Sequence, residues 1–199
     1  MLKRCLNRLL LAGIFCGSAT AWAEAGNEAL FEVQFTGYAR ANQGSSLLTT
    51  QLYAEHPLPV RDVAAFLVVH HDQDFDAAYV GLARKFGDLQ LGIGLGSAWY
   101  DGIRHPTINP WLYYGGDDAE AYLTAEHYGR DAVVPWFYKG YASRRMGDSL
   151  SIGVYVEKGL RAGPMVDWRN GAVRLWFTVP AVSLALDSSR AVAGIQNAF

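Results

Sequence analysis

The sequence predicts an all-β protein, an antiparallel up-and-down transmembrane β-barrel of about 10–12 strands. Three observations lead to this prediction. Short segments rich in Val, Ile, Leu, Tyr, Phe and Trp follow one another, and turn signals such as Gly-Asp, Asp-Gly and Asn-Gly separate them, as is typical of β-hairpins. Apolar and polar residues alternate within these segments. A segment with the features of an export signal precedes them all.

Residues 1–23 are predicted to be a cleaved signal peptide. The segment begins with a positively charged region, made by Lys3, Arg4 and Arg8. The apolar stretch Leu9–Cys16 follows, and an A-x-A cleavage pattern ends at Ala23. An uncleaved anchor helix is the alternative, but the apolar stretch is shorter than the roughly 20 residues that a spanning helix needs. Residues 24–199 are therefore predicted to form a single β-barrel domain.

The composition of the expected mature chain excludes several function classes. Both cysteines, Cys5 and Cys16, lie in the signal, so no disulfide, thiol chemistry or Cys-based metal site is expected. The signal holds three of the 17 Lys and Arg and none of the 19 Asp and Glu, which leaves 14 against 19 and a net charge of −5. This acidic balance argues against nucleic acid as a partner.

The alternation gives the predicted sheet one aliphatic and one polar face. Every second residue from Leu89 to Leu95, and again from Leu150 to Val156, is Leu, Ile or Val. Successive side chains of a strand point to opposite faces. A soluble barrel turns its aliphatic face inward, whereas a membrane barrel turns it outward to lipid and keeps polar residues in the lumen.

The charges favour the membrane architecture, because they fall on the other face. The predicted lumen-lining residues are Glu32, Arg40, Glu55, Glu120, Glu126, Lys139, Glu157, Arg169 and Arg174. Opposite charges in this set are expected to pair across a narrow lumen. Aromatic residues near segment ends are predicted to form the interface girdles of such barrels. They are Trp99, Trp111, Tyr113, Trp136 and Trp168.

Eleven segments are expected to be strands. They lie near residues 31–41, 46–56, 60–71, 75–86, 88–100, 109–114, 119–129, 133–145, 149–158, 164–169 and 172–180. Because a closed bacterial single-chain barrel has an even number of strands, either 181–186 or the stretch ending at Phe199 is expected to add a twelfth; ten strands is the alternative. The longest connection is predicted at about Asp101–Ile108.

A short motif recurs in three of the segments. An aromatic residue, a Gly two residues on and an Ala two further on lead to a Gly turn and a Leu. The motif starts at Phe35 and again 103 residues later at Tyr138, and a copy one residue shorter starts at Tyr79. It predicts a repeated hairpin whose small residues share one face.

The chain resembles bacterial outer-membrane β-barrels as a class, over about residues 28–187. A looser similarity to the C-terminal barrels of exopolysaccharide exporters and phage-adsorption outer-membrane proteins rests on Leu89–Tyr100, Tyr113–Asp118 and Arg161–Arg169. The resemblance implies an outer-membrane location with lipid as a neighbour. Because the helical repeats of the large exporters are absent, it also implies separate polysaccharide-export partners in the envelope for any transport role.

No catalytic residue, metal or cofactor is expected. Outer-membrane lipid hydrolases resemble one another in a His and a Ser spaced two apart, and none of the five histidines has such a serine. Glu126 and His127 with Ser143 are a conceivable substitute. His70 and His71 are metal-type ligands, but neighbours in a strand point apart.

The predicted function is therefore that of a small outer-membrane barrel with a structural, binding, minor channel or exporter-accessory role. A soluble periplasmic barrel that binds an apolar ligand and a lipid-modifying outer-membrane enzyme are the alternatives. The orientation of the aliphatic face distinguishes the first alternative from the membrane barrel, and a convergent His–Ser or His–Asp pair at one rim would favour the second.

Overall fold

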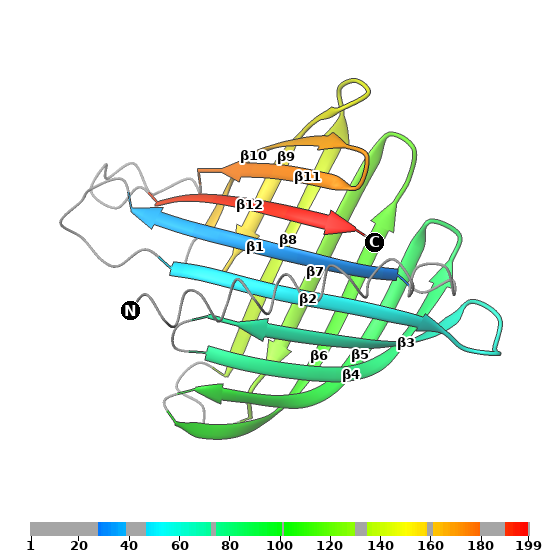
Figure 1. Cartoon of the computed structure of the whole chain (residues 1–199), viewed down its shortest axis with the longest axis vertical. Helices are drawn as coiled ribbons and strands as arrows, with labels where there is room; N and C mark the ends of the chain where they lie inside the picture. The colour runs from blue at the N-terminus through cyan, green and yellow to red at the C-terminus, as the bar shows by residue number, and fades with distance from the viewer. Residues whose placement is uncertain are drawn as a thin grey trace.

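The computed structural model of the chain is a closed antiparallel barrel of 12 strands in up-and-down order, in which β1 pairs with β12 (Figure 1). It describes residues 28–38, 47–72, 75–100, 102–129, 135–158, 161–179 and 190–198. The strands are β1 (Glu28–Tyr38), β2 (Leu47–Pro57), β3 (Val63–His71), β4 (Phe75–Phe86), β5 (Leu89–Tyr100), β6 (Ile103–Gly115), β7 (Ala119–His127), β8 (Trp136–Arg145), β9 (Leu150–Glu157), β10 (Arg161–Asn170), β11 (Val173–Thr178) and β12 (Arg190–Ala198). The predicted fold class is confirmed.

The last strand closes the ring, so no strand edge is left open. The pairing of β1 with β12 runs from Leu30 opposite Ala198 to Tyr38 opposite Arg190. The twelfth strand thus comes from the C-terminal end of the chain. Residues 181–186, Phe199 and the predicted signal peptide lie outside the described residues. In the described part of the chain, no helix is long and apolar enough to cross a membrane.

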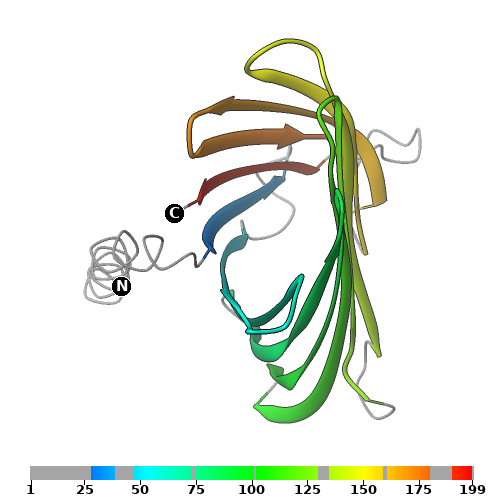
Figure 2. The same cartoon turned by 90° about the vertical axis from the view of Figure 1, so that its right-hand side faces the viewer.

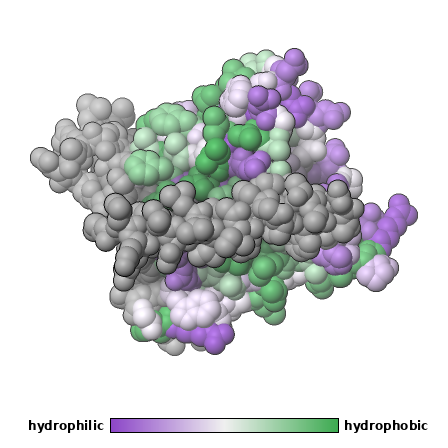
Figure 3. All heavy atoms as spheres, viewed as in Figure 1, coloured by the Kyte–Doolittle hydropathy of each residue, from purple (hydrophilic) through white to green (hydrophobic). Residues whose placement is uncertain are grey.

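The aliphatic face of the strands lies on the outside of the barrel. Leu95, in the middle of β5, is 63% exposed, and Val80, Ile93 and Val154 are also exposed, whereas Gly94 is buried. Figure 3 shows hydrophobic residues over much of the visible wall, and many hydrophilic residues gather at its right-hand end. The soluble alternative needed the aliphatic side chains inside, and the described strands place them outside.

One end of the barrel, called the turn end below, carries the short turns between β2 and β3, β4 and β5, β6 and β7, β8 and β9, and β10 and β11. The start of β1 and the end of β12 also lie there. The two-residue turn at 87–88 begins with Gly87 and the one at 171–172 with Gly171, both with positive φ (61° and 57°). Glycine adopts this conformation at little cost.

Strand β6 is longer than the sequence predicts. It covers 13 residues, Ile103–Gly115, and pairs with β5 from Ile103 to Tyr114, so the predicted long connection at 101–108 is wrong. The strand includes Pro106 and Pro110, although proline lacks the N–H that a central strand needs. The pairing of β6 with β7 is interrupted beside Pro110, so the ladder is lost on that side only.

The three copies of the motif do not present the same face. Phe35 and Tyr138 lie on the outer surface, whereas Tyr79 points inward and is 1% exposed. Ala142 of the second copy is exposed, and Ala83 of the third is buried. The motif therefore marks hairpins, and its Gly and Ala share one face within a copy, but this is the outer face in the second copy and the inner face in the third.

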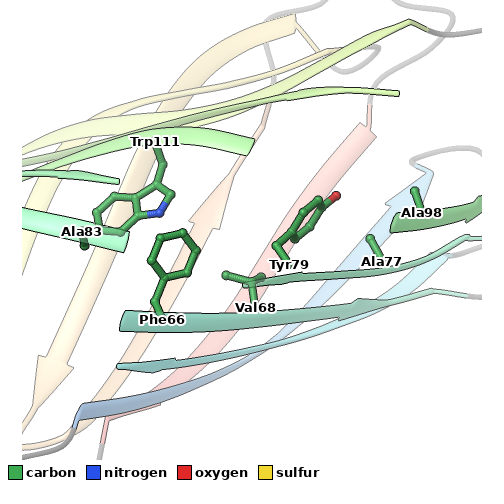
Figure 4. Packing of buried hydrophobic residues seen from close by; sticks show 7 residues of the cluster. All are labelled: Phe66, Val68, Ala77, Tyr79, Ala83, Ala98 and Trp111. Carbon is green, nitrogen blue, oxygen red and sulfur yellow. The ribbon is translucent and has the colours of Figure 1, made fainter. Parts of the chain in front are cut away.

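The interior of the barrel is packed with side chains. One cluster comprises Phe66, Val68, Ala77, Tyr79, Ala83, Ala98 and Trp111 (Figure 4). The ring of Phe66 lies edge-on to Trp111, with 5.5 Å between their centroids. A second cluster comprises Tyr155, Met165, Trp176 and Val192. The two clusters fill part of the interior, so any open space in the lumen lies between their side chains.

Candidate functional site

A cavity of about 520 Å³ occupies the turn end of the barrel. Its lining extends from Glu28 and Glu55 near the turns to Lys139 and Met165 in the middle of their strands. Most strands contribute, because every second side chain of each strand points inward. The cavity is therefore a compartment of the lumen.

The side chain of Lys139 reaches across the lumen at the inner end of this cavity. The Lys139 Nζ donates to Glu32 Oε1 at 2.7 Å and to Gln34 Oε1 at 2.8 Å. Lys139 lies on β8 and both acceptors lie on β1, with four strands between them on one side of the ring and six on the other. Figure 2 shows β1, in blue, facing the green and yellow wall that contains β8. The three side chains are called the cross-lumen bridge below.

A second charged network lies nearer the turns, around Arg174 of β11. Its guanidinium donates to Asp167 Oδ2 at 2.9 Å, to Glu120 Oε1 at 3.0 Å and to the Tyr141 hydroxyl at 2.7 Å. Arg169 also pairs with Glu120 and with Asp167. Asp167 is fully buried, and a buried carboxylate needs such partners to offset its lost hydration.

Two further carboxylates are held by neutral donors. Glu126 accepts hydrogen bonds from the hydroxyls of Tyr79, at 2.6 Å, and Tyr128, at 2.5 Å. Glu55 accepts from Gln90 Nε2 at 2.9 and 3.1 Å. The contacts of Tyr79 with Glu126 and of Gln90 with Glu55 join strands that are not neighbours, so they fix side chains across the interior rather than along one wall.

The predicted lumen-lining residues fall in three groups. The cavity is lined by Glu32, Glu55, Glu120, Lys139, Arg169 and Arg174. Glu126 and Glu157 lie deeper in the interior, where Glu157 accepts from Gln34 Nε2 at 3.4 Å. Arg40 lies outside the described residues.

The predicted interface aromatics divide between the two faces. Trp99, Trp136 and Trp168 are exposed on the outer surface. Trp111 is only 7% exposed and lines the cavity, as does Tyr113, so the interface prediction is wrong for these two. They share the inward face of β6 with the buried Asn109. The short predicted segment 109–114 did not show which of its alternating residues point inward.

Several aromatic side chains of the cavity were not among the predicted lumen-lining residues. They are Tyr53, Tyr122, Tyr141, Tyr155 and Trp176. Alternation was a usable signal for Trp176, because it lies two residues from Arg174 in the same strand and therefore on the same face.

The structure does not assemble the conceivable catalytic group. Glu126 points inward, whereas the ring of His127 packs against Trp136 on the other face of the sheet, with 4.5 Å between centroids. Ser143 pairs with Glu120, not with His127. Among the described residues, no group of three His, Cys, Asp or Glu is placed to hold a metal ion, and His71 contacts Asp76.

The sequence matches no protein-family model and no curated protein. Solved porin structures share its fold. The KdgM porin is similar with a TM-score of 0.53 and 13% identity, over 85% of this chain and 99% of the porin. The KdgM porin in complex with disordered oligogalacturonate gives a TM-score of 0.53 and 12% identity over the same shares. At this identity the likeness concerns the fold alone.

The shared fold fits the class of outer-membrane β-barrels that the sequence resembles. The looser similarity to exopolysaccharide exporters and phage-adsorption proteins finds no support in these porin structures. The predicted polysaccharide-export partners stay a prediction.

Proposed function

We propose that this protein is a narrow porin-like channel of the outer membrane that passes small solutes. The observation that carries the proposal is a closed barrel with aliphatic side chains exposed outside and a charged, hydrogen-bonded cavity inside. A sheet closed in this way has no unpaired edge, which is what a β-structure needs in order to cross a bilayer. Outer-membrane lipid is then the immediate neighbour of Leu95 and the other exposed aliphatic residues.

The turn end is assigned to the periplasm in this proposal. Outer-membrane barrels have short turns on the periplasmic side and longer loops outside the cell. Five short turns lie at the turn end, together with the start of β1 and the end of β12. The cavity would then open toward the periplasm, and the cross-lumen bridge would separate it from the outer half of the lumen.

The charge of the interior supports a preference for cations and neutral solutes. Among the described residues that line the cavity or belong to the hydrogen-bonded groups beside and below it, seven carboxylates stand against three cations. The carboxylates are Glu28, Glu32, Glu55, Glu120, Glu126, Glu157 and Asp167, and the cations are Lys139, Arg169 and Arg174. The formal balance is −4 if all are ionised. A lumen of one sign attracts counter-ions and repels co-ions.

The negative charge balance of the interior restricts the class of solute that the channel passes. The similar KdgM porin has been solved with an oligogalacturonate, which is a chain of sugar carboxylates. An acidic interior disfavours such a polyanion, so we propose a different solute for this chain.

Conductance of the purified protein in planar lipid bilayers tests the proposal. Small single-channel steps with a reversal potential of the cation-selective sign are expected under a salt gradient. Faster gel migration without boiling, on the membrane fraction, checks that the barrel is closed and embedded. A folded, embedded barrel that gives no steps would contradict the channel.

A further inference from the structure

The charges of the barrel are divided by sign between its two faces. Carboxylates are in excess on the inward face, as described above. On the outward face of the described strands only Asp76 is acidic, whereas the cationic residues are Arg84, Arg104, Arg144 and, directly after β9, Lys158. The chain as a whole has a formal net charge of −2, so its positively charged outer wall does not follow from composition.

A row of five outward-facing side chains crosses the wall near the end opposite the turn end, called the loop end below. Each member is the cross-strand partner of the next, on β2 to β6: Thr50, His71, Asp76, Trp99 and Arg104. On the turn-end side of this row, Val69, Val80 and Leu95 expose apolar side chains. The row therefore marks the boundary between the aliphatic band and a polar zone, where the headgroups of a bilayer lie.

The Arg104 guanidinium is held against the wall at this boundary. Its Cζ lies 5.5 Å from the centroid of the Trp99 ring, and its Nε donates to Ser97 Oγ at 2.9 Å. Arg104 is exposed, and among the described residues no carboxylate pairs with it. Asp76, the carboxylate of the row, contacts the His71 imidazole instead. The terminal nitrogens of Arg104 are therefore available to an anion from outside the chain.

This arrangement suits a phosphate. A planar guanidinium offers parallel N–H groups to two phosphate oxygens, and the indole of Trp99 limits the directions in which it can point. Phosphates are the anionic groups that membrane lipids present at the depth of the aromatic belt. Basic side chains at this depth bind lipid headgroups in other membrane proteins.

The apolar wall next to Arg104 favours a phosphate that belongs to a lipid. Toward the turn end, the outward positions of β5 include Leu95, Ile93 and Leu91, which are all exposed. A lipid can lay its acyl chains on these residues while its phosphate meets Arg104, whereas a free phosphate ion would leave them uncovered. In the proposed orientation the loop end lies in the outer leaflet, where the anchor of lipopolysaccharide, lipid A, is a phosphorylated and acylated disaccharide.

We infer that the outer face of β5 and β6 at the loop end is a binding site for the phosphate of an outer-leaflet lipid. Arg104 is the cation that meets the phosphate, and Trp99 and Ser97 position it. The inference goes beyond the proposed channel. It depends on the embedded barrel and its assigned orientation, but not on conduction.

Titration of the folded protein with lipid A in neutral detergent, followed by native mass spectrometry, tests the inference. The probes are lipid A with its phosphates and the same lipid with them removed. The phosphorylated form is expected to bind about fivefold more tightly or better. Excess inorganic phosphate should not displace it, because the acyl chains contribute to binding. Equal binding of the two lipids would overturn the inference, and displacement by inorganic phosphate would show a site for a free ion instead.

Variants locate the site. Arg104→Gln is expected to weaken lipid A binding about fivefold, and Arg104→Lys should lose less, because it keeps the charge but not the planar fork. Arg61→Gln is the matched control. It removes the same charge from a 93% exposed side chain in the turn between β2 and β3, and it should leave binding unchanged. Gel migration without boiling checks that each variant folds.

The outcomes separate this inference from the channel. Unaltered affinity in Arg104→Gln, or an equal loss in Arg61→Gln, would show that lipid A is not bound at Arg104. Conductance steps without phosphate-dependent lipid binding would overturn the lipid site and leave the channel. Lipid A binding that depends on Arg104, in a barrel that gives no conductance, would overturn the channel and leave the lipid site.

Discussion

Lys139 Nζ and Glu32 Oε1 lie 2.7 Å apart, although their strands stand on nearly opposite walls of the barrel. Both side chains are largely buried, with 12% and 8% of their surface exposed. A buried pair of this kind costs much hydration on each side and depends on its partner for compensation. The contact therefore links two walls of the barrel at the inner end of the cavity.

Removing one partner should destabilise the barrel more than removing both. Lys139→Met leaves the Glu32 carboxylate buried without its cation, and about 3–5 kcal/mol of unfolding free energy is expected to be lost. Lys139→Met with Glu32→Gln should recover much of that loss. Denaturant unfolding of the reconstituted barrel measures both. A double variant as unstable as the single one would contradict a coupled pair.

Shortening both partners should open the lumen. Lys139→Ser with Glu32→Ser removes the atoms that cross it, so single-channel conductance is expected to rise severalfold. Asp76→Asn, on the outer face of β4, is the control and should not change the conductance. Unchanged conductance in the serine pair would mean that the bridge does not limit the current.

Ion selectivity should follow the carboxylates of the cavity. Glu28→Gln with Glu55→Gln reduces the formal interior charge from −4 to −2. The reversal potential in a KCl gradient should therefore move toward zero. The shift is expected to be larger at low salt, because screening is weaker there. Asp76→Asn serves again as the control. An unchanged potential would show that these carboxylates do not face the permeation path.

A glycine that lies under a tryptophan ring should not tolerate a methyl group. Gly92→Ala places a Cβ 2.2 Å from the rigid Trp111 ring, so a loss of about 1–3 kcal/mol is expected. Gly147→Ala, in the turn between β8 and β9, meets no atom within 4 Å and should be nearly neutral. The temperature at which the fast-migrating gel band disappears compares them. Equal temperatures would mean that the indole does not lie on the glycine.

Charged substitutions on the outer face test directly whether it contacts the membrane. Leu95→Arg in the middle of β5 should cost about 2–4 kcal/mol in lipid, because a charge at the bilayer midplane is poorly solvated. Met146→Arg, equally exposed but in the turn after β8, should change stability by less than about 0.5 kcal/mol. Equal stability of the two variants in lipid would argue against a lipid-facing wall.

Part of the site could be predicted from the sequence, because alternation is local. Glu32 and Glu120 stand between apolar neighbours in their segments, so each could be placed on the polar face without knowledge of the barrel. The inward face of β6 could not, because the predicted segment 109–114 covers only half of the strand Ile103–Gly115. Trp111 and Tyr113 were predicted to be interface aromatics because they lie near the ends of that segment, but they line the cavity.

The sequence by itself determined the all-β class, the two faces of the strands and the charges of the polar face. These depend on residues that are neighbours in the chain, and a period of two is visible in them directly. Only the tertiary structure decided that Lys139 meets Glu32 across the lumen and that Trp111 and Trp176 share one cavity. Lys139 and Glu32 are 107 residues apart in the chain. Contacts between such distant residues depend on strand number and register around the closed ring, which no local pattern encodes.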